Sequence, residues 1–203
     1  MEPYQKNYRH MKNFLMLLLG ALLLGSCSNA EQQSSTSNEH DHTAAASEAK
    51  KKPKSPKQMA MTNVGENHVH IEYSSPSKRG RLIFGGLVGY GEVWVTGAHR
   101  ATSISFASDV KMGGVDIPAG KYGLFTIPDE EEWTIIINTN WDQHLADDYQ
   151  ESEDVVRVKA NATKLNEVVE SLTYEVVEID ASTGSITISW DDTSVSFEIK
   201  NQS

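Results

Sequence analysis

Two histidines and a glutamate stand at alternate positions in the sequence His68-x-His70-x-Glu72. In a β-strand, alternate side chains point to the same face and lie about 6.5–7 Å apart. Two imidazoles and a carboxylate at that spacing are typical zinc ligands, so the trio is a candidate metal site. The alternative is the solvent-facing side of an outer strand whose intervening apolar residues point inward.

A second group of chemically capable residues follows in a glycine-rich stretch. Its candidates for ligand binding are Arg79, Arg81, Trp94, His99 and Arg100. The nearby glycines indicate turns, which can gather such side chains at one end of a β-domain. Guanidinium groups there can hold a carboxylate or a phosphate through paired hydrogen bonds. The alternative is a folded loop whose arginines pair with acids of the protein itself.

A third group lies in residues 138–149, where Trp141 and Asp142 stand among asparagine, glutamine and further acidic side chains. Sugar-binding sites use this combination, because aromatic faces stack on C–H groups of the sugar while amides and carboxylates bond its hydroxyls. The alternative is that the tryptophan belongs to the core of the domain.

The templates of common enzymes are missing from the sequence. It has no Gly-x-Ser-x-Gly elbow, no phosphate-binding loop and no His-Glu-x-x-His motif. Asp142, His144 and Ser152 could form a triad, but their spacing alone does not show it. The four acids of residues 129–132 are expected on a solvated turn, and no cofactor is predicted.

Alternation of polar and apolar residues predicts that most of the chain beyond the N-terminal region consists of β-strands. The predicted strands cover residues 68–73, 102–106, 109–117, 122–127, 133–137, 154–159, 185–190 and 194–199. The 109–117 segment is expected to turn back at Gly113-Gly114, and a second hairpin is expected at residues 191–193. Helical spacing of apolar residues in 165–172 predicts a short helix, which leads into a further strand at residues 172–177. The expected fold is all-β, an antiparallel β-sandwich (jelly-roll-like or related) of about eight or nine strands with at most one short helix.

The N-terminal part of the chain has the pattern of a bacterial lipoprotein signal. Lys12 precedes an apolar run at residues 14–24, which is shorter than the ~20 residues of a membrane-spanning helix. Residues 24–27, Leu-Gly-Ser-Cys, then match a lipobox, in which small residues precede the cut and the cysteine thiol receives the lipid. We predict that residues 1–26 are a signal peptide and that Cys27 is lipidated; Met11 is an alternative start.

Cys27 is the only cysteine of the chain, so its lipidation leaves the mature protein without disulfides, thiolate ligands or a cysteine nucleophile. Residues 27–57 are predicted to be a disordered tether, because they are rich in small and polar residues and lack Phe, Tyr and Trp. Residues 58–203 are predicted to form the β-sandwich domain.

The net charge of −10 argues against nucleic acid as a partner, since nucleic acid requires a basic face. The predicted partner is a membrane, reached through the lipid anchor. Ser28 lacks the acidic character of the aspartate that retains some lipoproteins at the inner membrane. We therefore expect the outer membrane rather than the inner membrane as the location in the cell envelope.

Several phrases of the sequence, in this order, resemble a known family. They stand at residues 73–81, 83–88, 90–94, 96–98 and 118–128, and at Trp133 and Trp141. Together they are similar to the domain of unknown function 2911 family, typical of exported proteins of the Bacteroidota. The resemblance covers nearly all of residues 58–203 and implies no established activity.

Two positions depart from the usual pattern of that family. Val95 stands where the family usually has an arginine, and His99-Arg100 stands where it usually has Asn-Glu. If these positions form a site in the family, its charge is different in this chain.

The sequence as a whole predicts a non-catalytic, lipid-anchored domain that binds a glycan, a small anion or a partner protein at the cell envelope. The alternative is a small metal-dependent or hydrolytic enzyme that uses His99 or the His68/His70 pair, and a third interpretation is a structural envelope component. A deep polar cleft would favour the enzyme. A shallow groove lined by aromatic residues would favour binding, and a filled domain without a concavity would favour the structural interpretation.

Overall fold

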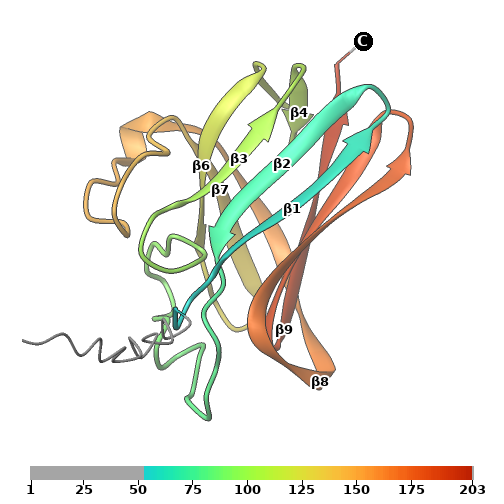
Figure 1. Cartoon of the computed structure of the whole chain (residues 1–203). Helices are drawn as coiled ribbons and strands as arrows, with labels where there is room; N and C mark the ends of the chain where they lie inside the picture. Colours follow the sequence, from blue (N-terminus) through green and yellow to red (C-terminus); the bar gives the residue numbers. More distant parts are fainter. Residues whose placement is uncertain (1–52, 203) are drawn as a thin grey trace, which may run out of the picture. The chain divides into compact units, whose positions relative to one another are not determined.

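The computed structural model describes residues 53–202, all of which belong to the second of two units of the chain, Ala49–Ser203. The predictions for the signal peptide, for Cys27 and for most of the tether lie outside these residues. The strands are β1 Lys57–Val64, β2 Asn67–Ser74, β3 Thr102–Phe106, β4 Val110–Met112, β5 Val115–Ile117, β6 Gly120–Ile127, β7 Glu132–Asn138, β8 Asp154–Asp180 and β9 Thr183–Asn201 (Figure 1).

The nine strands of the described residues pair in one sheet in the order β1-β2-β3-β6-β7-β8-β9-β4-β5, and every pairing is antiparallel. The long strand β8 joins two halves of this sheet. Its first part pairs with β7, in the first half, which contains β1, β2, β3, β6 and β7. Its later part pairs with β9, in the second half, which also contains β4 and β5. The register between β8 and β9 shifts near Lys164 and Val169, where β-bulges bend the strands, and β8 curves strongly at the lower end of Figure 1.

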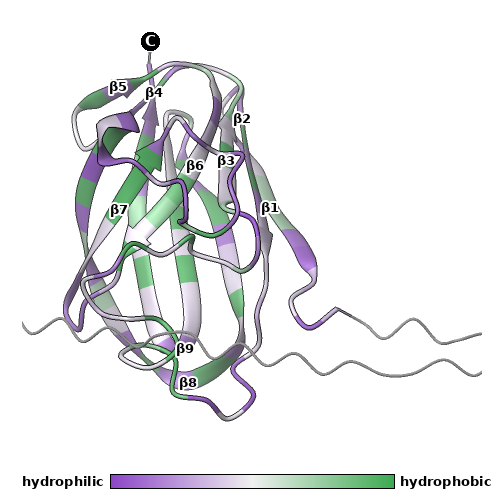
Figure 2. Ribbon diagram, turned by 90° about the vertical axis from the view of Figure 1, so that its left-hand side faces the viewer, coloured by the Kyte–Doolittle hydropathy of each residue, from purple (hydrophilic) through white to green (hydrophobic). Residues whose placement is uncertain are grey.

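Apolar side chains from the inner faces of both halves meet in one core. Ile71, Ile104 and Ile135 of the first half belong to the same buried cluster as Ile188 and Phe197 of β9. Figure 2 shows apolar residues along β6 and β7. Full burial of each such side chain contributes about 1.5–3 kcal/mol to stability, so this contact is what holds the two halves face to face.

The prediction of an antiparallel all-β domain is confirmed. Residues 133–137 lie in β7, between β6 and β8, as a central strand. The predicted turn at Gly113-Gly114 joins β4 to β5, with φ values of +57° and +88° that favour glycine. The expectation of two separate sheets is not confirmed, because the strands form one continuous sheet.

The predicted helix at residues 165–172 is wrong, because this segment belongs to β8. The described residues contain a single turn of 3-10 helix, Glu151–Glu153, and no α-helix. The helical spacing of the apolar residues arose from an irregular strand. Its register shifts change which face of the sheet each side chain points to. Leu172 is buried there, whereas Val168 is exposed.

The predicted hairpin at residues 191–193 is also wrong, since the chain continues through them within β9. Asp191 has a left-handed φ of +56° at a bulge. The actual turn lies at residues 181–182, where the Asp180 carboxylate accepts hydrogen bonds from the backbone N–H of Ser182 at 2.8 Å and of Thr183 at 2.9 Å. Polar residues that favour a turn also favour a bulge, so the sequence pattern did not separate the two.

In the part of the chain that the structure describes, no helix has the length and apolar character to cross a membrane.

Candidate ligand-binding groove

The outer face of the first half of the sheet presents polar side chains in register across adjacent strands. Glu72 of β2 is paired with Met59 of β1 on one side and with Ser103 of β3 on the other. Lys121 of β6 is paired with Ser105 of β3. Because antiparallel partners share a face, these side chains all point away from the main core.

Two loops cover the part of this outer face that lies over β6 and β7. They are residues 93–101, here called the first loop, and residues 139–150, here called the second loop. Val95 and Ala101 of the first loop pack on Phe125 and Ile136 in a small buried cluster. The outer face is therefore open over β1 to β3 and covered over β6 and β7.

Backbone hydrogen bonds join the two loops to each other. The N–H of Ala101 donates to the carbonyl of Gln143 at 3.0 Å, and the N–H of Leu145 donates to the carbonyl of His99 at 2.7 Å. The second loop is also fixed to β8, because the Tyr149 hydroxyl donates to the Asp154 carboxylate at 2.7 Å. These bonds hold Trp141 at the edge of the covered region.

A groove with a volume of about 200 Å³ lies at the step between the open and covered parts. It is lined by Lys57, Gln58, Met59, Glu72, Tyr73, Ser74, Arg100, Ala101, Ser103, Lys121 and Trp141. Trp141 is 38% exposed, and the Lys121 ammonium lies 4.4 Å from the centroid of its ring. An exposed indole thus forms part of the wall and a cation covers one of its faces.

Glu72, Arg100 and Lys121 of the groove are paired but remain accessible to solvent. Lys121 Nζ lies 2.7 Å from Glu72 Oε2, and this hydrogen bond is the main cause that lowers the pKa of Glu72 below its ordinary value. Arg100 pairs with Asp142, and both side chains are more than half exposed. Because exposed pairs are weak, a bound anion can compete with these carboxylates for the two cations.

The groove unites residues from all three groups that the sequence singled out. Glu72 comes from the predicted zinc trio, Arg100 from the arginine group, and Trp141 with its neighbour Asp142 from the sugar-site group. Sequence reasoning missed Lys121, whose place depends on the pairing of β6 with β3. A lysine just before a predicted strand gave no signal of its own.

The arginine group is not brought together as one site. Arg81 donates from its guanidinium to the backbone carbonyls of Ser77 at 2.6 Å and Lys78 at 3.0 Å. The Arg79 guanidinium donates to the carbonyl of Lys54 at 2.8 Å. The guanidinium groups of these two arginines therefore tie down their own chain segment, and neither residue lines the groove.

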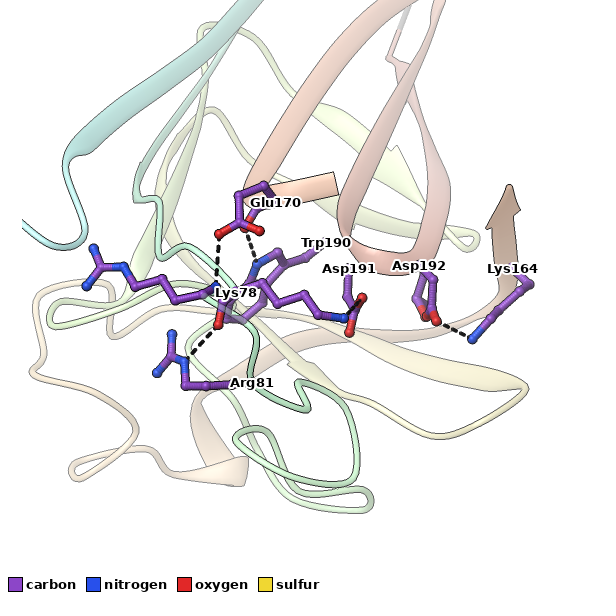
Figure 3. Close-up of polar contacts among 9 residues, drawn as sticks. Lys78, Arg81, Lys164, Glu170, Trp190, Asp191 and Asp192 are labelled. Atoms are coloured by element: carbon purple, nitrogen blue, oxygen red, sulfur yellow. Dashed lines mark hydrogen bonds and ion pairs between the residues drawn. The ribbon is translucent and has the colours of Figure 1, made fainter. Parts of the chain in front are cut away.

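Arg81 belongs to a polar cluster at the bend of β8 and β9, which also contains Lys78, Glu170, Trp190 and Asp191. The Trp190 indole N–H donates to the Glu170 carbonyl at 3.3 Å. Figure 3 shows the Lys78 side chain reaching Asp191, whose carboxylate is almost fully buried. This cluster fastens the loop after β2 to the bent strands, which is a structural role.

Trp94 is half-buried and packs against the core, and it does not line the groove. Its ring stacks on Trp190 with 5.9 Å between the ring centroids, and its indole N–H donates to the Gly97 carbonyl at 3.2 Å. His99 is exposed, has a left-handed φ of +68° and offers only its backbone carbonyl to the second loop.

The zinc trio lies on the outward face of β2, as its alternation predicted, but it does not assemble. His68 Nδ1 is 2.8 Å from the Asn63 side-chain oxygen, and Glu72 is directed to Lys121. Within residues 53–202, no group of three or more His, Asp or Glu side chains is arranged to hold a metal ion. The zinc hypothesis therefore has no support from this geometry.

The possible triad of Asp142, His144 and Ser152 does not form either. His144 Nδ1 lies 3.4 Å from the Asp147 carboxylate, and among the described residues no hydrogen bond joins Asp142, His144 and Ser152. Trp141 is the residue of this segment that lines the groove.

A second, larger cleft of about 630 Å³ lies beside the polar cluster. Its charged lining is Glu130, Glu131, Lys164, Asp191 and Asp192. Asp192 is paired with Lys164, and burial together with nearby Glu130 raises the pKa of Tyr90 in its wall. Four carboxylates against one lysine make this cleft unfavourable for an anion.

The fold and the groove thus define an antiparallel all-β protein with a small ligand-sized concavity on its outer face. The profile of the family described as Protein of unknown function (DUF2911) matches residues 55–199. The chain belongs to this family. Comparisons with curated proteins and with solved structures give no match.

Proposed function

We propose that this protein is a lipid-anchored component of the cell envelope whose outer-face groove binds the end of an acidic glycan. The observation on which the proposal depends is the groove itself, where Trp141, Arg100 and Lys121 converge around about 200 Å³ of free volume. Each of the three supplies one feature that an acidic sugar needs.

The size of the groove favours a single sugar unit. Pockets for drug-sized molecules measure roughly 300–1,000 Å³, so a groove of about 200 Å³ admits one ring or the terminal residue of a longer chain. Its open mouth allows the rest of a polymer to extend into solvent. Trp141 supplies the apolar surface on which the C–H face of the ring rests, and Ser103 and Gln58 supply groups that bond hydroxyls.

The charge of the groove favours an acidic sugar over a neutral one. Three cations, Lys57, Arg100 and Lys121, line it, against the carboxylate of Glu72 in the lining and that of Asp142 beside it, which pairs with Arg100. This is a local cationic surface on a chain whose net charge is −10. Guanidinium and ammonium groups form charge-assisted hydrogen bonds with a carboxylate, and those bonds are about twice as strong as neutral ones.

Binding is favoured over glycoside cleavage by the number of acids in the groove. Most glycosidases place two carboxyl groups about 5–9.5 Å apart across the bond that they cleave. Glu72 is the one carboxylate among the described lining residues, and it is already bonded to Lys121.

The binding test is calorimetric titration of the full chain with oligosaccharides that contain uronic acids and with neutral oligosaccharides of equal length. We expect the acidic series to bind and the neutral series to bind much more weakly. Trp141→Ala and Arg100→Gln should each weaken binding by roughly tenfold or more, as expected for the loss of a hydrogen bond to a charged group or of an equivalent contact. Lys164→Gln is the matched control, because it removes an exposed cation outside the groove.

Equal affinity for neutral and acidic sugars, no binding to either series, or unchanged binding by the Trp141 and Arg100 variants would overturn the proposal. Weaker binding in the Lys164 control would have the same consequence, since it would show a response to overall charge.

The anchor half of the proposal depends on Cys27 and the lipobox before it. Expression of the wild type in a host that processes lipoproteins should give a membrane-bound chain that incorporates labelled palmitate. Cys27→Ser should remove the label and leave an unprocessed or soluble chain. Labelling that persists in Cys27→Ser would show that the lipid is attached elsewhere.

A further inference from the structure

Two methionines on β1 are placed where methionine is uncommon. Met59 is 58% exposed and Met61 is 46% exposed, whereas Met112 is fully buried in the core. Methionine is among the residues most often buried, because its side chain is apolar. Two exposed thioethers at alternate positions on one strand therefore call for an explanation other than packing.

The strand register places these thioethers beside the two histidines of β2. Met61 is the direct partner of His70, and Asn63 is the direct partner of His68. Direct partners have Cβ atoms about 4.5–5.5 Å apart, and the next residue on the same face is about 6.5–7 Å along the strand. We call Met59, Met61, His68 and His70 the thioether patch.

His70 has a nitrogen that the protein leaves unused. Its Nε2 atom is shielded from solvent and has no hydrogen-bond partner. The rings of His68 and His70 meet edge to face with 6.0 Å between their centroids. A buried polar atom without a partner is rare and indicates strain or an absent ligand, and neutral imidazole nitrogen is the commonest metal ligand in proteins.

The combination of donor atoms selects the metal. Thioether sulfur is a soft ligand that selects Cu(I), whereas Zn²⁺ takes thiolate, imidazole or carboxylate. The nearest carboxylate, Glu72, is engaged by Lys121 at 2.7 Å. Thioether and imidazole are uncharged donor groups, and the charge of the Glu72 carboxylate is already balanced by Lys121. Such surroundings suit a monovalent cation.

We infer that the thioether patch is a Cu(I)-binding site, with Met61 and His70 as its central ligands and Met59 and His68 completing it. The site lies on the outer face of β1 and β2, next to the groove, and of its four residues only Met59 also lines the groove. It does not depend on glycan binding.

The test is competition for Cu(I) between the protein and a chromogenic Cu(I) chelator, without oxygen and with excess reductant. The full chain with Cys27→Ser is the background, because it removes the only thiol. We expect a site that holds one Cu(I) per chain. Met61→Leu keeps the apolar volume and removes the sulfur. We expect it to weaken Cu(I) binding by at least about tenfold, because even the loss of a residue that only contacts a metal ligand has an effect of that size. His70→Gln should have the same effect.

Three controls separate the patch from other sources of binding. His144→Gln removes an exposed histidine elsewhere and should change nothing. His40 and His42 lie outside the described residues, so the loss caused by Met61→Leu should persist when both are changed to alanine. Trp141→Ala, which damages the groove, should leave Cu(I) binding intact. Each variant is first checked for an unchanged melting temperature.

X-ray absorption at the copper edge gives the second readout, and sulfur and nitrogen neighbours are expected. The inference is overturned if Cu(I) affinity is unchanged in Met61→Leu, if all binding disappears with His40 and His42, or if the absorption spectrum shows no sulfur. Zn²⁺ binding that is lost in His70→Gln but kept in Met61→Leu would replace it with an imidazole site for zinc.

Discussion

The outer-face groove and the polar cluster at the bend of β8 and β9 both contain lysine–carboxylate pairs, but in opposite surroundings. In the groove, the Lys121 and Glu72 side chains are 33% and 52% exposed. In the cluster, the Lys78 and Asp191 side chains are 24% and 7% exposed. Water therefore screens the exposed Lys121–Glu72 pair strongly and the buried Lys78–Asp191 pair only weakly. An exposed pair can exchange partners with a ligand, whereas a buried pair fixes the fold.

The two regions also share a strained backbone. His99 has φ +68° beside the groove, and Asp191 has φ +56° in the cluster. Such a conformation costs about 1–2 kcal/mol for most residues other than glycine, and less for asparagine and aspartate. Asp191 is compensated by its buried ion pair with Lys78, whereas the exposed His99 side chain has no comparable partner among the described residues.

The largest expected effect is on the buried pair. Lys78→Met removes the cation and leaves the Asp191 carboxylate buried without a partner, so the free energy of unfolding should fall by about 3 kcal/mol. Chemical denaturation monitored by tryptophan fluorescence measures it. Lys164→Met removes a lysine from the exposed pair with Asp192 and should leave the free energy of unfolding nearly unchanged. Equal losses in the two variants would contradict the distinction between buried and exposed pairs.

A smaller effect is expected at the strained residue beside the groove. Glycine adopts a left-handed φ without a Cβ clash but loses more chain entropy on folding, so His99→Gly should raise the free energy of unfolding by about 0.5 kcal/mol. The melting temperature should rise slightly, and the groove should keep its ligand affinity, because His99 does not line it. A clear loss of stability would show that the His99 imidazole makes a stabilising contact in the folded protein.

The smallest expected effect on stability comes from the titration of Glu72, whose own pKa can be measured directly. Its hydrogen bond with Lys121 lowers its pKa in the folded state. The stability that this pair contributes is therefore present above the unfolded pKa of about 4.3 and is lost as the pH falls through the lowered folded pKa. NMR titration of the Glu72 carboxyl carbon should give a midpoint below the ordinary glutamate value.

Lys121→Met is the control for that titration. It should move the Glu72 midpoint upward, toward the ordinary value of a glutamate, because the main cause of the lowered pKa is removed. A midpoint that does not move would show that Lys121 is not bonded to Glu72 in solution, and its ammonium group would then be free to contact a ligand.

Local sequence patterns predicted those parts of the fold that depend on neighbours along the chain. The alternation in residues 68–73 and the central strand at 133–137 follow from the side-chain period of two in a strand. They failed at residues 165–172 and 191–193, because a bulge in a long strand breaks that period and uses the same polar residues as a turn.

For the candidate site, the sequence found single residues and assigned them to three different groups. Glu72, Arg100 and Trp141 were each singled out for different chemistry, and the structure places them around one groove. Lys121 carried no signal, and neither did the pairing of Met61 with His70. Both depend on which strands pair and in which register, and register is fixed by the buried face and not by the exposed residues.

By itself, therefore, the sequence determined the antiparallel all-β class, the outward position of the β2 histidines and membership of the family, since these properties are encoded locally or in the order of short phrases. The tertiary structure alone decided which polar residues meet. Burial of the apolar inner faces sets the strand register, and that register brings residues of β1, β2, β3, β6 and both loops to one groove as a consequence.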